Sequence, residues 1–375
     1  MENISVGSDY LQYVPCLRWK QGEYQAVSRL SAQTRRNITP LIEVPAIGYD
    51  FESRTQAKTL DNHLAPFAKR VQEKWGRQCC FVDLHLINST ERMAEGLHPV
   101  RFIFDTLRQR HCSVVPVTGI DRDEAYQQQV KAMLSTSESR VCIRLSLEQA
   151  ARKSIGRHLN SLLLLLEVKA ENCDLILDLG APANFIPLDG FCRLVHAVVK
   201  DLPLLSQWRT FTFLGTSFPE SMGKVNTGEE VVPRYEWQLY KLLITACHGE
   251  GLRMPTFGDY AVSHPSVTQL DMRRIRPAAK IRYTTEDGWY VVKGRNVRED
   301  RFGKFEQYRG LSRKIISSEY YCGPSFSWGD DYILKCAQGA GGPGNLTMWV
   351  EVDVNHHLEK VARDIASFSG SSNTL

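Results

Sequence analysis

Short apolar runs alternate along the chain with longer stretches in which apolar residues recur every three or four positions. The short runs are rich in β-branched residues, which is typical of buried strands, and the spacing in the longer stretches is typical of helices. Such runs occupy residues 13–20, 38–44, 80–87, 114–118, 141–145, 175–179, 211–214 and 256–262. This alternation predicts parallel strands that are joined by crossover helices.

The number and length of these units favour one fold over its main alternative. Eight strand-and-helix units within about 260 residues match the size of a single (β/α)8 barrel. A doubly wound open sheet would gather its polar residues at one switch point, whereas several of these runs end on a polar or charged residue. We therefore expect an α/β protein whose TIM-barrel-like core spans residues 10–275.

The pattern changes after residue 275. Residues 280–293 are expected to form an inserted β-hairpin, because Glu-Asp-Gly between two apolar runs is a typical turn. A helix is expected near residues 305–317, where it is a candidate for a displaced eighth helix of the barrel. Together, residues 276–368 are expected to form a small α+β extension that packs on the barrel or completes it.

The end of the chain is expected to hold three further segments. Residues 347–352 are expected to be extended, because the sequence TMWVEV alternates and is rich in strand-forming residues. A last helix is expected over residues 355–368, with Asp353 or Asn355 as its N-cap. Residues 369–375 are expected to be a flexible tail.

Polar residues near the ends of the predicted strands are the main candidates for chemistry. They are Lys20, Glu43, Asp83, His85, Thr118, Arg144, Asp178, Ser217 and Asp259. Asp83 and His85 are two residues apart on a strand, so their side chains point the same way. Such a pair can act as acid and base or share a metal ion. Lys20 and Arg144 would add fixed positive charge that suits a phosphate or a carboxylate.

These residues predict a site for an anionic, phosphate-bearing ligand at the barrel mouth. The catalytic candidates are Lys20, Asp83, His85 and Arg144, and the ligand-binding candidates of the mouth are Glu43, Asp178 and Asp259. Two of the carboxylates, Glu43 and Asp178, could complete a divalent-metal site, although the identity of any cofactor stays unknown. The alternative is an ion-pair network that closes the barrel interior. Thr118 and Ser217 could simply cap the helices that follow them.

The C-terminal region offers a second group of ligand-binding candidates. They are Trp328, Asp330, His356 and His357. The aromatic segment 325–330 either packs on the protein or forms a lid over the mouth. A histidine at the start of a helix can bind an anion, cap the helix or pack, and adjacent histidines point in different directions, so they are not expected to chelate together.

Residues 339–344 formally fit the dinucleotide fingerprint G-x-G-x-x-G. That fingerprint requires a strand before it and a helix after it. Because the residues that follow are expected to be extended, the sequence does not predict a dinucleotide site here.

Composition and charge exclude several classes of protein. The 375 residues include 46 basic and 42 acidic residues, a balance too even for a general nucleic-acid or membrane surface. The basic cluster 273–276 is short, so general nucleic-acid binding is not expected.

The longest apolar run, 162–166, falls far short of the roughly 20 residues that cross a bilayer. With no secretory signal pattern at the N-terminus, we expect a cytoplasmic protein with no membrane contact, whose ten cysteines are mostly reduced and buried.

Four segments resemble one known family. They are YVPCLRWKQGE at 13–23, ITPLIEVP at 38–45, FSWGDDYI at 326–333 and GNLTMWVEVDVNHH at 344–357. They are similar to the Beta protein family of phages, satellite phages and prophages, and the resemblance covers nearly the whole chain. It implies a mobile-element protein with a role in competition between phages or in anti-phage defence. It identifies no catalytic residues.

Two functional hypotheses follow from the sequence. In the first, the barrel is an enzyme, a metal-assisted hydrolase or phosphodiesterase that acts on a phosphate-bearing substrate. Barrel phosphodiesterases are an analogy only, because the first run here ends in Trp-Lys-Gln. In the second, the protein is a non-catalytic sensing or interaction module that recognises a phage component or a companion protein. Its recognition surface would include Trp328, Trp349 and His356.

Overall fold

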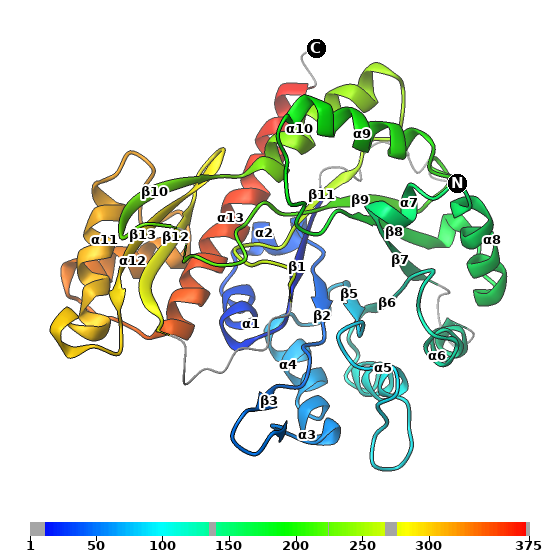
Figure 1. The fold of residues 1–375 in the computed structure, drawn as a ribbon, viewed down its shortest axis with the longest axis horizontal. Coiled ribbons are helices and arrows are strands. Elements are labelled where there is room, and N and C mark those ends of the chain that lie inside the picture. The colour runs from blue at the N-terminus through cyan, green and yellow to red at the C-terminus, as the bar shows by residue number, and fades with distance from the viewer. Residues whose placement is uncertain (1–11, 135–139, 224, 267–275, 373–375) are drawn as a thin grey trace.

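A closed barrel of eight parallel strands forms the centre of the computed structural model, which describes residues 12–134, 140–223, 225–266 and 276–372 (Figure 1). The strands are β1 (Tyr13–Leu17), β2 (Leu41–Glu43), β5 (Cys80–Asp83), β6 (Val114–Thr118), β7 (Val141–Ser146), β8 (Cys173–Asp178), β9 (Thr210–Leu214) and β11 (Thr256–Asp259). β1 pairs with β2 on one side and with β11 on the other, so the sheet has no edge. The predicted TIM-barrel-like core is confirmed, and the open sheet is excluded.

Helices surround the barrel between successive strands (Figure 1). They are α1 (Gln21–Ser28), α2 (Ala32–Asn37), α3 (Leu60–Leu64), α4 (Phe67–Lys74), α5 (Pro99–Gln109), α6 (Glu124–Leu134), α7 (Leu147–Ala150), α8 (Ile155–Leu166), α9 (Leu188–Lys200) and α10 (Tyr235–Gly249). The sequence of α5 specifies both its start and its buried face. Pro99 occupies the first turn, and Ile103, Phe104 and Leu107 form one buried stripe. The two-residue strands β3 (Tyr49–Asp50) and β4 (Thr55–Gln56) pair in the loop after β2.

Side chains alternate along each barrel strand, so they form one apolar layer inside the barrel and another between the barrel and the helices. On β5, Phe81 packs inside the barrel, whereas Cys80 and Val82 pack outward against the helices. Cys16 on β1 and Cys142 on β7 also pack inside. All ten cysteines are free, and most are buried, as expected.

The C-terminal region builds a second, antiparallel sheet beside the barrel (Figure 1). The predicted hairpin is confirmed as β12 (Ala278–Thr284) and β13 (Gly288–Asn296). A third strand, β10 (Gly228–Pro233), comes from the barrel loop between β9 and α10 and pairs with β13. α11 (Gln307–Ser317) and α12 (Trp328–Gln338) pack together on this sheet, which therefore has its own apolar cluster.

The last helix corrects three expectations. α13 (Leu346–Ser372) is one continuous helix, so the expected extended segment 347–352 is wrong, and so are Asp353 and Asn355 as N-caps. Its β-branched residues favoured a strand, but burial of Trp349 and other apolar residues at helical spacing overrides that preference. The expected tail at 369–375 is helical as far as residue 372, and residues 373–375 lie outside the described residues.

α13, and not α11, is the outer helix that completes the barrel. α13 packs against α1, α2 and β1 on one side and against β12 on the other, whereas α11 packs on the second sheet. The contact with α1 is close, because a Cβ on Gly22 would lie 2.6 Å from Cγ1 of Val350. The segment 339–344 therefore does precede a helix, but it follows α12, so the strand of a dinucleotide site is missing.

Candidate functional site

Five of the predicted mouth residues lie together at the carboxyl ends of the strands. Glu43, Asp83 and Asp178 end β2, β5 and β8, Arg144 lies on β7, and His85 follows β5. Because side chains alternate along a strand, the four residues on strands point into the barrel, like Phe81 two residues before Asp83, and His85 lies in the turn after β5.

Arg144 is the centre of this cluster. Its Nη1 donates hydrogen bonds to Glu43 (2.9 Å) and to Asp83 (3.0 Å), and its Nε donates to Asp178 (2.9 Å). Its Nη2 donates to the hydroxyl of Tyr260 (2.9 Å), which in turn donates to Asp178. Every nitrogen of the guanidinium is therefore engaged within the protein. Arg144 holds the cluster together and has no donor left for an external anion.

Burial and paired charges shift the pKa values of the cluster. Burial alone raises the pKa of Asp83, but the neighbouring charges of Arg122, His85 and Arg144 outweigh it and hold the pKa well below its usual range. Burial and then the charge of Asp178 raise the pKa of Tyr260. Asp83 is thus ionised and Tyr260 neutral over the ordinary pH range.

The imidazole of His85 lies at the mouth within reach of solvent. Its Nδ1 lies 3.1 Å from Oδ2 of Asp83, and its Nε2 lies 3.6 Å from Oε1 of Glu43. The side chain is 26% exposed, whereas both carboxylates are almost completely buried. An imidazole that solvent can reach can take part in proton transfer.

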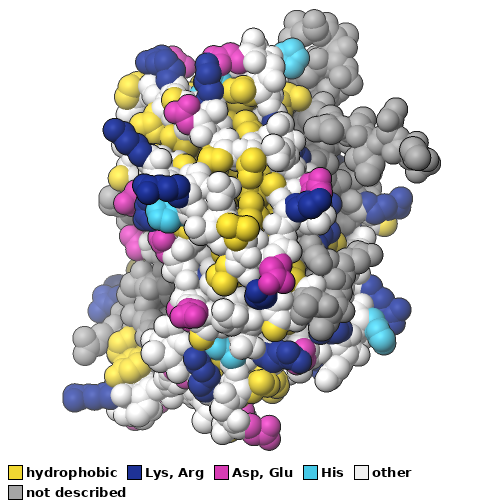
Figure 2. All heavy atoms as spheres, turned by 90° about the vertical axis from the view of Figure 1, so that its right-hand side faces the viewer, with side chains coloured by type: hydrophobic (Ala, Val, Ile, Leu, Met, Phe, Trp, Pro, Cys, Tyr) yellow, Lys and Arg dark blue, Asp and Glu magenta, His cyan; other side chains and the backbone are white. Residues whose placement is uncertain are grey.

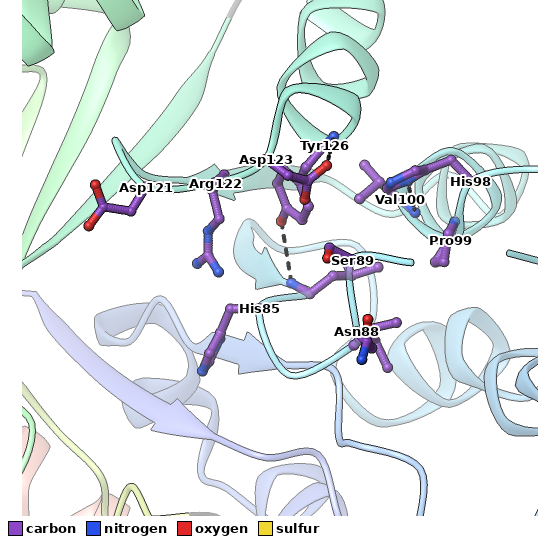
Figure 3. Close-up of a pocket in the computed structure, with 12 residues that line it drawn as sticks. His85, Asn88, Ser89, His98, Pro99, Val100, Asp121, Arg122, Asp123 and Tyr126 are labelled. Atoms are coloured by element: carbon purple, nitrogen blue, oxygen red, sulfur yellow. Dashed lines mark hydrogen bonds between the residues drawn. The ribbon is translucent and has the colours of Figure 1, made fainter. Parts of the chain in front are cut away.

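A cavity of about 380 Å³ opens beside His85. It lies between the loop that follows β5 and the loop that precedes α6, and in Figure 3 the side chain of Arg122 points from the second loop toward His85. Arg122 donates through Nη2 to both oxygens of Asp83, at 3.0 and 3.1 Å. Arg122 was not among the residues predicted from the sequence. A basic residue in a loop after a predicted barrel strand was the available signal.

Lys20 does not join the cluster. The strand ends at Leu17, and Trp19 has a positive φ of 51°, so the alternation breaks before Lys20. Lys20 is exposed at the N-cap of α1, and Arg18 takes the inward position, with its Nε 4.0 Å from Glu43. Side chains two residues apart on a strand share a face, so the inward positions of Val14 and Cys16 favour Arg18 as the next inward residue.

The two hydroxyl residues of the predicted mouth have packing roles. Thr118 is buried and donates to Gln127 of α6 (2.9 Å). Ser217 accepts a hydrogen bond from the backbone of Tyr235 at the start of α10 (2.9 Å) and donates to Glu236 (2.6 Å). Ser217 thus fits the helix-capping alternative that the sequence left open, whereas Thr118 bonds a side chain within α6 and does not cap that helix.

Asp259 lies outside the mouth, in a buried network between the barrel and α13. It accepts hydrogen bonds from Tyr13 (2.6 Å) and pairs with Nε2 of His357 (2.9 Å), whose Nδ1 lies 2.8 Å from the hydroxyl of Thr284. Arg234 is completely buried beside them, with its Nη2 4.0 Å from Asp259. Asp259 shares the outward face of β11 with Phe257, and Tyr260 takes the inward place at the mouth.

The other C-terminal candidates also lie within the protein. His356 pairs with Asp330 through Nδ1 (2.9 Å) and stacks on Tyr283 at 3.8 Å between ring centroids. Trp328 begins α12 and lies under the guanidinium of Arg29, 4.1 Å from the ring centroid. The segment 325–330 therefore packs against α1 and α13, which is the packing alternative for this segment.

The buried pair of His357 and Asp259 predicts a loss of stability in mild acid. Burial lowers the pKa of His357 below 6.5, so the unfolded chain binds a proton first and stability falls as the pH drops below about 6.5. The pKa of Asp259 is also lowered, because His357 and Arg234 outweigh its burial, so a second loss follows below about pH 4. Chemical denaturation should show that the free energy of unfolding is lower at pH 5.5 than at pH 7.5, and this difference should be smaller in His357→Gln. The exposed His248→Gln is the control, and an equal loss in both variants would contradict this assignment.

The side chains of the mouth do not fit the divalent metal that the sequence allowed. Within the four described stretches of the chain, no group of three or more His, Cys, Asp and Glu residues is placed to hold a metal ion. The guanidinium of Arg144 lies between Glu43, Asp83 and Asp178, where a cation would have to bind. Arginine charge therefore neutralises these carboxylates.

The surface agrees with the even charge balance. On the face over the right-hand elements of Figure 1, basic and acidic side chains are interspersed, with no field of one sign (Figure 2). The basic cluster 273–276 lies outside the described residues, apart from Arg276. Among the helices that the structure describes, none is long and apolar enough to cross a membrane.

Comparisons with known proteins identify a family and distant structural neighbours. The sequence profile of the Beta protein family matches residues 13–363. No curated protein matches the chain in sequence. Triosephosphate isomerase from Bartonella henselae is 12% identical, with a TM-score of 0.33 over 66% of this chain and 92% of that one. A GH18 chitinase from Pseudoalteromonas aurantia is 9% identical, with a TM-score of 0.36 over 66% and 93%.

Proposed function

Because the chain belongs to the Beta protein family, whose membership is consistent with a phage-associated protein, we propose that its barrel mouth is an acid–base site for a phosphate-bearing ligand. The biological setting that we propose is anti-phage defence or competition between phages. The reaction class is hydrolysis of a phosphate ester, and a phosphodiester is the substrate that we test.

One observation carries this proposal. His85 lies 3.1 Å from the ionised Asp83, which also pairs with Arg122, and His85 and Arg122 border a cavity open to solvent at the carboxyl ends of the barrel strands. A histidine that solvent can reach and that lies beside an ionised carboxylate can serve in proton transfer. A guanidinium in the same place suits a phosphate.

His85, Arg122 and Arg144 would have different roles in the reaction. His85 would take the proton from an attacking water molecule and return it to the leaving oxygen of the ester, so the ring ends each cycle as it began. Arg122 would bind the phosphate oxygens through the donors that Asp83 leaves free. Arg144 is a positioning residue, because all its donors are used to hold Glu43, Asp83 and Asp178.

The interaction-module hypothesis has less support from the C-terminal region. Trp349 and His356 are each only 1% exposed, so a partner could not contact them in this fold. Of the three residues that this hypothesis required, Trp328 alone keeps part of its surface exposed.

We expect His85→Gln to slow turnover strongly and to leave ligand binding in place. Loss of a general acid–base group should lower the rate of phosphodiester hydrolysis by about 10²- to 10⁴-fold, and the affinity for the product should change little because Arg122 remains. Phosphorus NMR of a panel of phosphodiesters measures the rate, and calorimetry measures the affinity. His248→Gln, which changes an exposed histidine of α10, is the matched control. A wild-type protein that hydrolyses no member of the panel, or equal rates in both variants, would remove the enzyme proposal.

A further inference from the structure

Three basic side chains lie on one face of the second sheet. Lys280 and Arg282 are two residues apart on β12, so their side chains share a face, and Lys293 of β13 lies directly opposite Lys280. Trp289 and Val291 of β13 share this face and pack in the apolar cluster of the barrel, so the face is turned toward the barrel. Lys280, Arg282 and Lys293 form the cationic cluster of the second sheet.

Two members of the cationic cluster are held by the protein, and the third is not. Nζ of Lys293 donates to two backbone oxygens of the loop before β10, at 2.7 and 2.5 Å, and Nε of Arg282 donates to Asp353 of α13 (2.6 Å). Among the described residues, the amine of Lys280 makes no hydrogen bond or ion pair, although its side chain is partly buried. Because Asp353 is bound to Arg282, a protonated Lys280 faces two like charges without a partner of its own.

These surroundings favour the neutral form of the amine. Burial and then the charge of Arg282 lower the pKa of Lys280 to about 8, with a smaller contribution from Lys293, and the charge of Asp353 opposes them only in part. An ordinary lysine has a pKa of about 10.4, so it is almost wholly protonated at pH 8. A lysine that is desolvated beside another cation is activated as a nucleophile.

We propose that Lys280 is a carboxylation site, at which Nζ reacts with carbon dioxide to form a carbamate. The lone pair of the neutral amine attacks the carbon atom, and a nitrogen–carbon bond forms. One carbon–oxygen π bond breaks, and its electron pair stays on the oxygen of the new carboxylate. The proton that Nζ loses passes to water, so the reaction needs no oxidant, reductant or metal ion.

The charges of the cationic cluster favour this product. Carboxylation replaces the positive charge at Lys280 by a negative one, so the two cations Arg282 and Lys293 then face two anions, the carbamate and Asp353. An imine formed with a simple aldehyde would bring no negative charge and would leave the cluster without compensation.

The cationic cluster also connects the second sheet to the barrel. Arg282 donates through Nη1 to the backbone oxygen of Val262 after β11 (3.1 Å), and Lys293 holds the loop between β9 and β10. Neutralising the cluster should therefore stabilise the contact between the sheet and these loops. This site is separate from His85 and Arg122, so the inference goes beyond the proposed function and does not depend on it.

Labelling of the wild-type protein tests the site directly. The protein is equilibrated with isotopically labelled bicarbonate at pH 8, carbamates are trapped by ethylation with triethyloxonium, and the peptides are analysed by mass spectrometry. Label at Lys280 should exceed label at the exposed Lys169 by about tenfold or more, because an ordinary lysine holds little neutral amine at this pH. Equal labelling of the two lysines, or no label at Lys280, would overturn the inference.

Two variants test whether the charge change stabilises the fold. The wild type should melt at a higher temperature in bicarbonate than in chloride of equal ionic strength, because the carbamate forms on the folded chain. Lys280→Gln removes one of three like charges, so it should be at least as stable as the wild type in chloride and should gain nothing from bicarbonate. Lys169→Gln is the matched control and should keep the wild-type gain. The same gain in both variants would show that bicarbonate acts only as a salt, and this result would contradict the proposal.

Discussion

Arg144→Met is expected to lower the free energy of unfolding by about 3–5 kcal/mol, because it leaves three buried carboxylates without their common partner. Methionine keeps much of the length of the side chain, so the loss reports the charge and its hydrogen bonds more than a cavity. Urea denaturation at pH 7 measures it. The deficit should shrink as the pH falls below about 4, because the low pKa of Asp83 depends partly on Arg144, and the stability that comes from a lowered carboxyl pKa is lost below the pKa of the unfolded chain.

Arg152→Ala is the control for this experiment. Arg152 lies just beyond β7 and pairs with Asp121, but both side chains are substantially exposed, at 39% and 53%. A surface pair of this kind contributes at most about 1 kcal/mol. Similar losses in Arg144→Met and Arg152→Ala would show that the network at the mouth does not hold the barrel together.

Asp259→Ala is expected to have an effect of the same size for a different reason. It removes the acceptor for Tyr13 and the partner of His357, and it leaves Arg234 buried with less compensation, which together should cost about 3–5 kcal/mol. Because these contacts join β1, β11 and α13, limited proteolysis should also cut the C-terminal region sooner. Denaturation and proteolysis together measure both effects.

Glu250→Ala provides the comparison for Asp259. Glu250 pairs with Lys200 on the surface, where both side chains are about half exposed, so its removal should change the free energy of unfolding very little. If Asp259→Ala unfolds at the same denaturant concentration as Glu250→Ala and resists protease equally well, the network does not secure α13.

The barrel and half of the site could be predicted from the sequence because both follow from periodicity. Alternation along parallel strands places Glu43, Asp83 and Arg144 on one face at one end of the sheet, whatever the loops do. The same rule pointed to Arg18, but it fails at Lys20 because the backbone at Trp19 leaves the extended conformation.

Other features depend on contacts that no local pattern shows. Arg122 belongs to a loop, and its role arises where two loops meet at the cavity. His356 and His357 look like site residues when the helix is thought to begin beside them, but α13 begins at Leu346 and buries both. β10 is largely exposed or only partly buried, and pairing with β13 is what makes it a strand.

The position of α13 has a consequence for synthesis on the ribosome. The outer face of β1 is covered by the last helix of the chain, roughly 100 residues after β11 has been made. At about 5–20 residues per second, the nascent barrel therefore waits on the order of ten seconds with its first strand uncovered. A messenger cut short before α13 would yield a chain that exposes an apolar surface, which chaperones or proteases would recognise, so only full-length translation yields a lasting product.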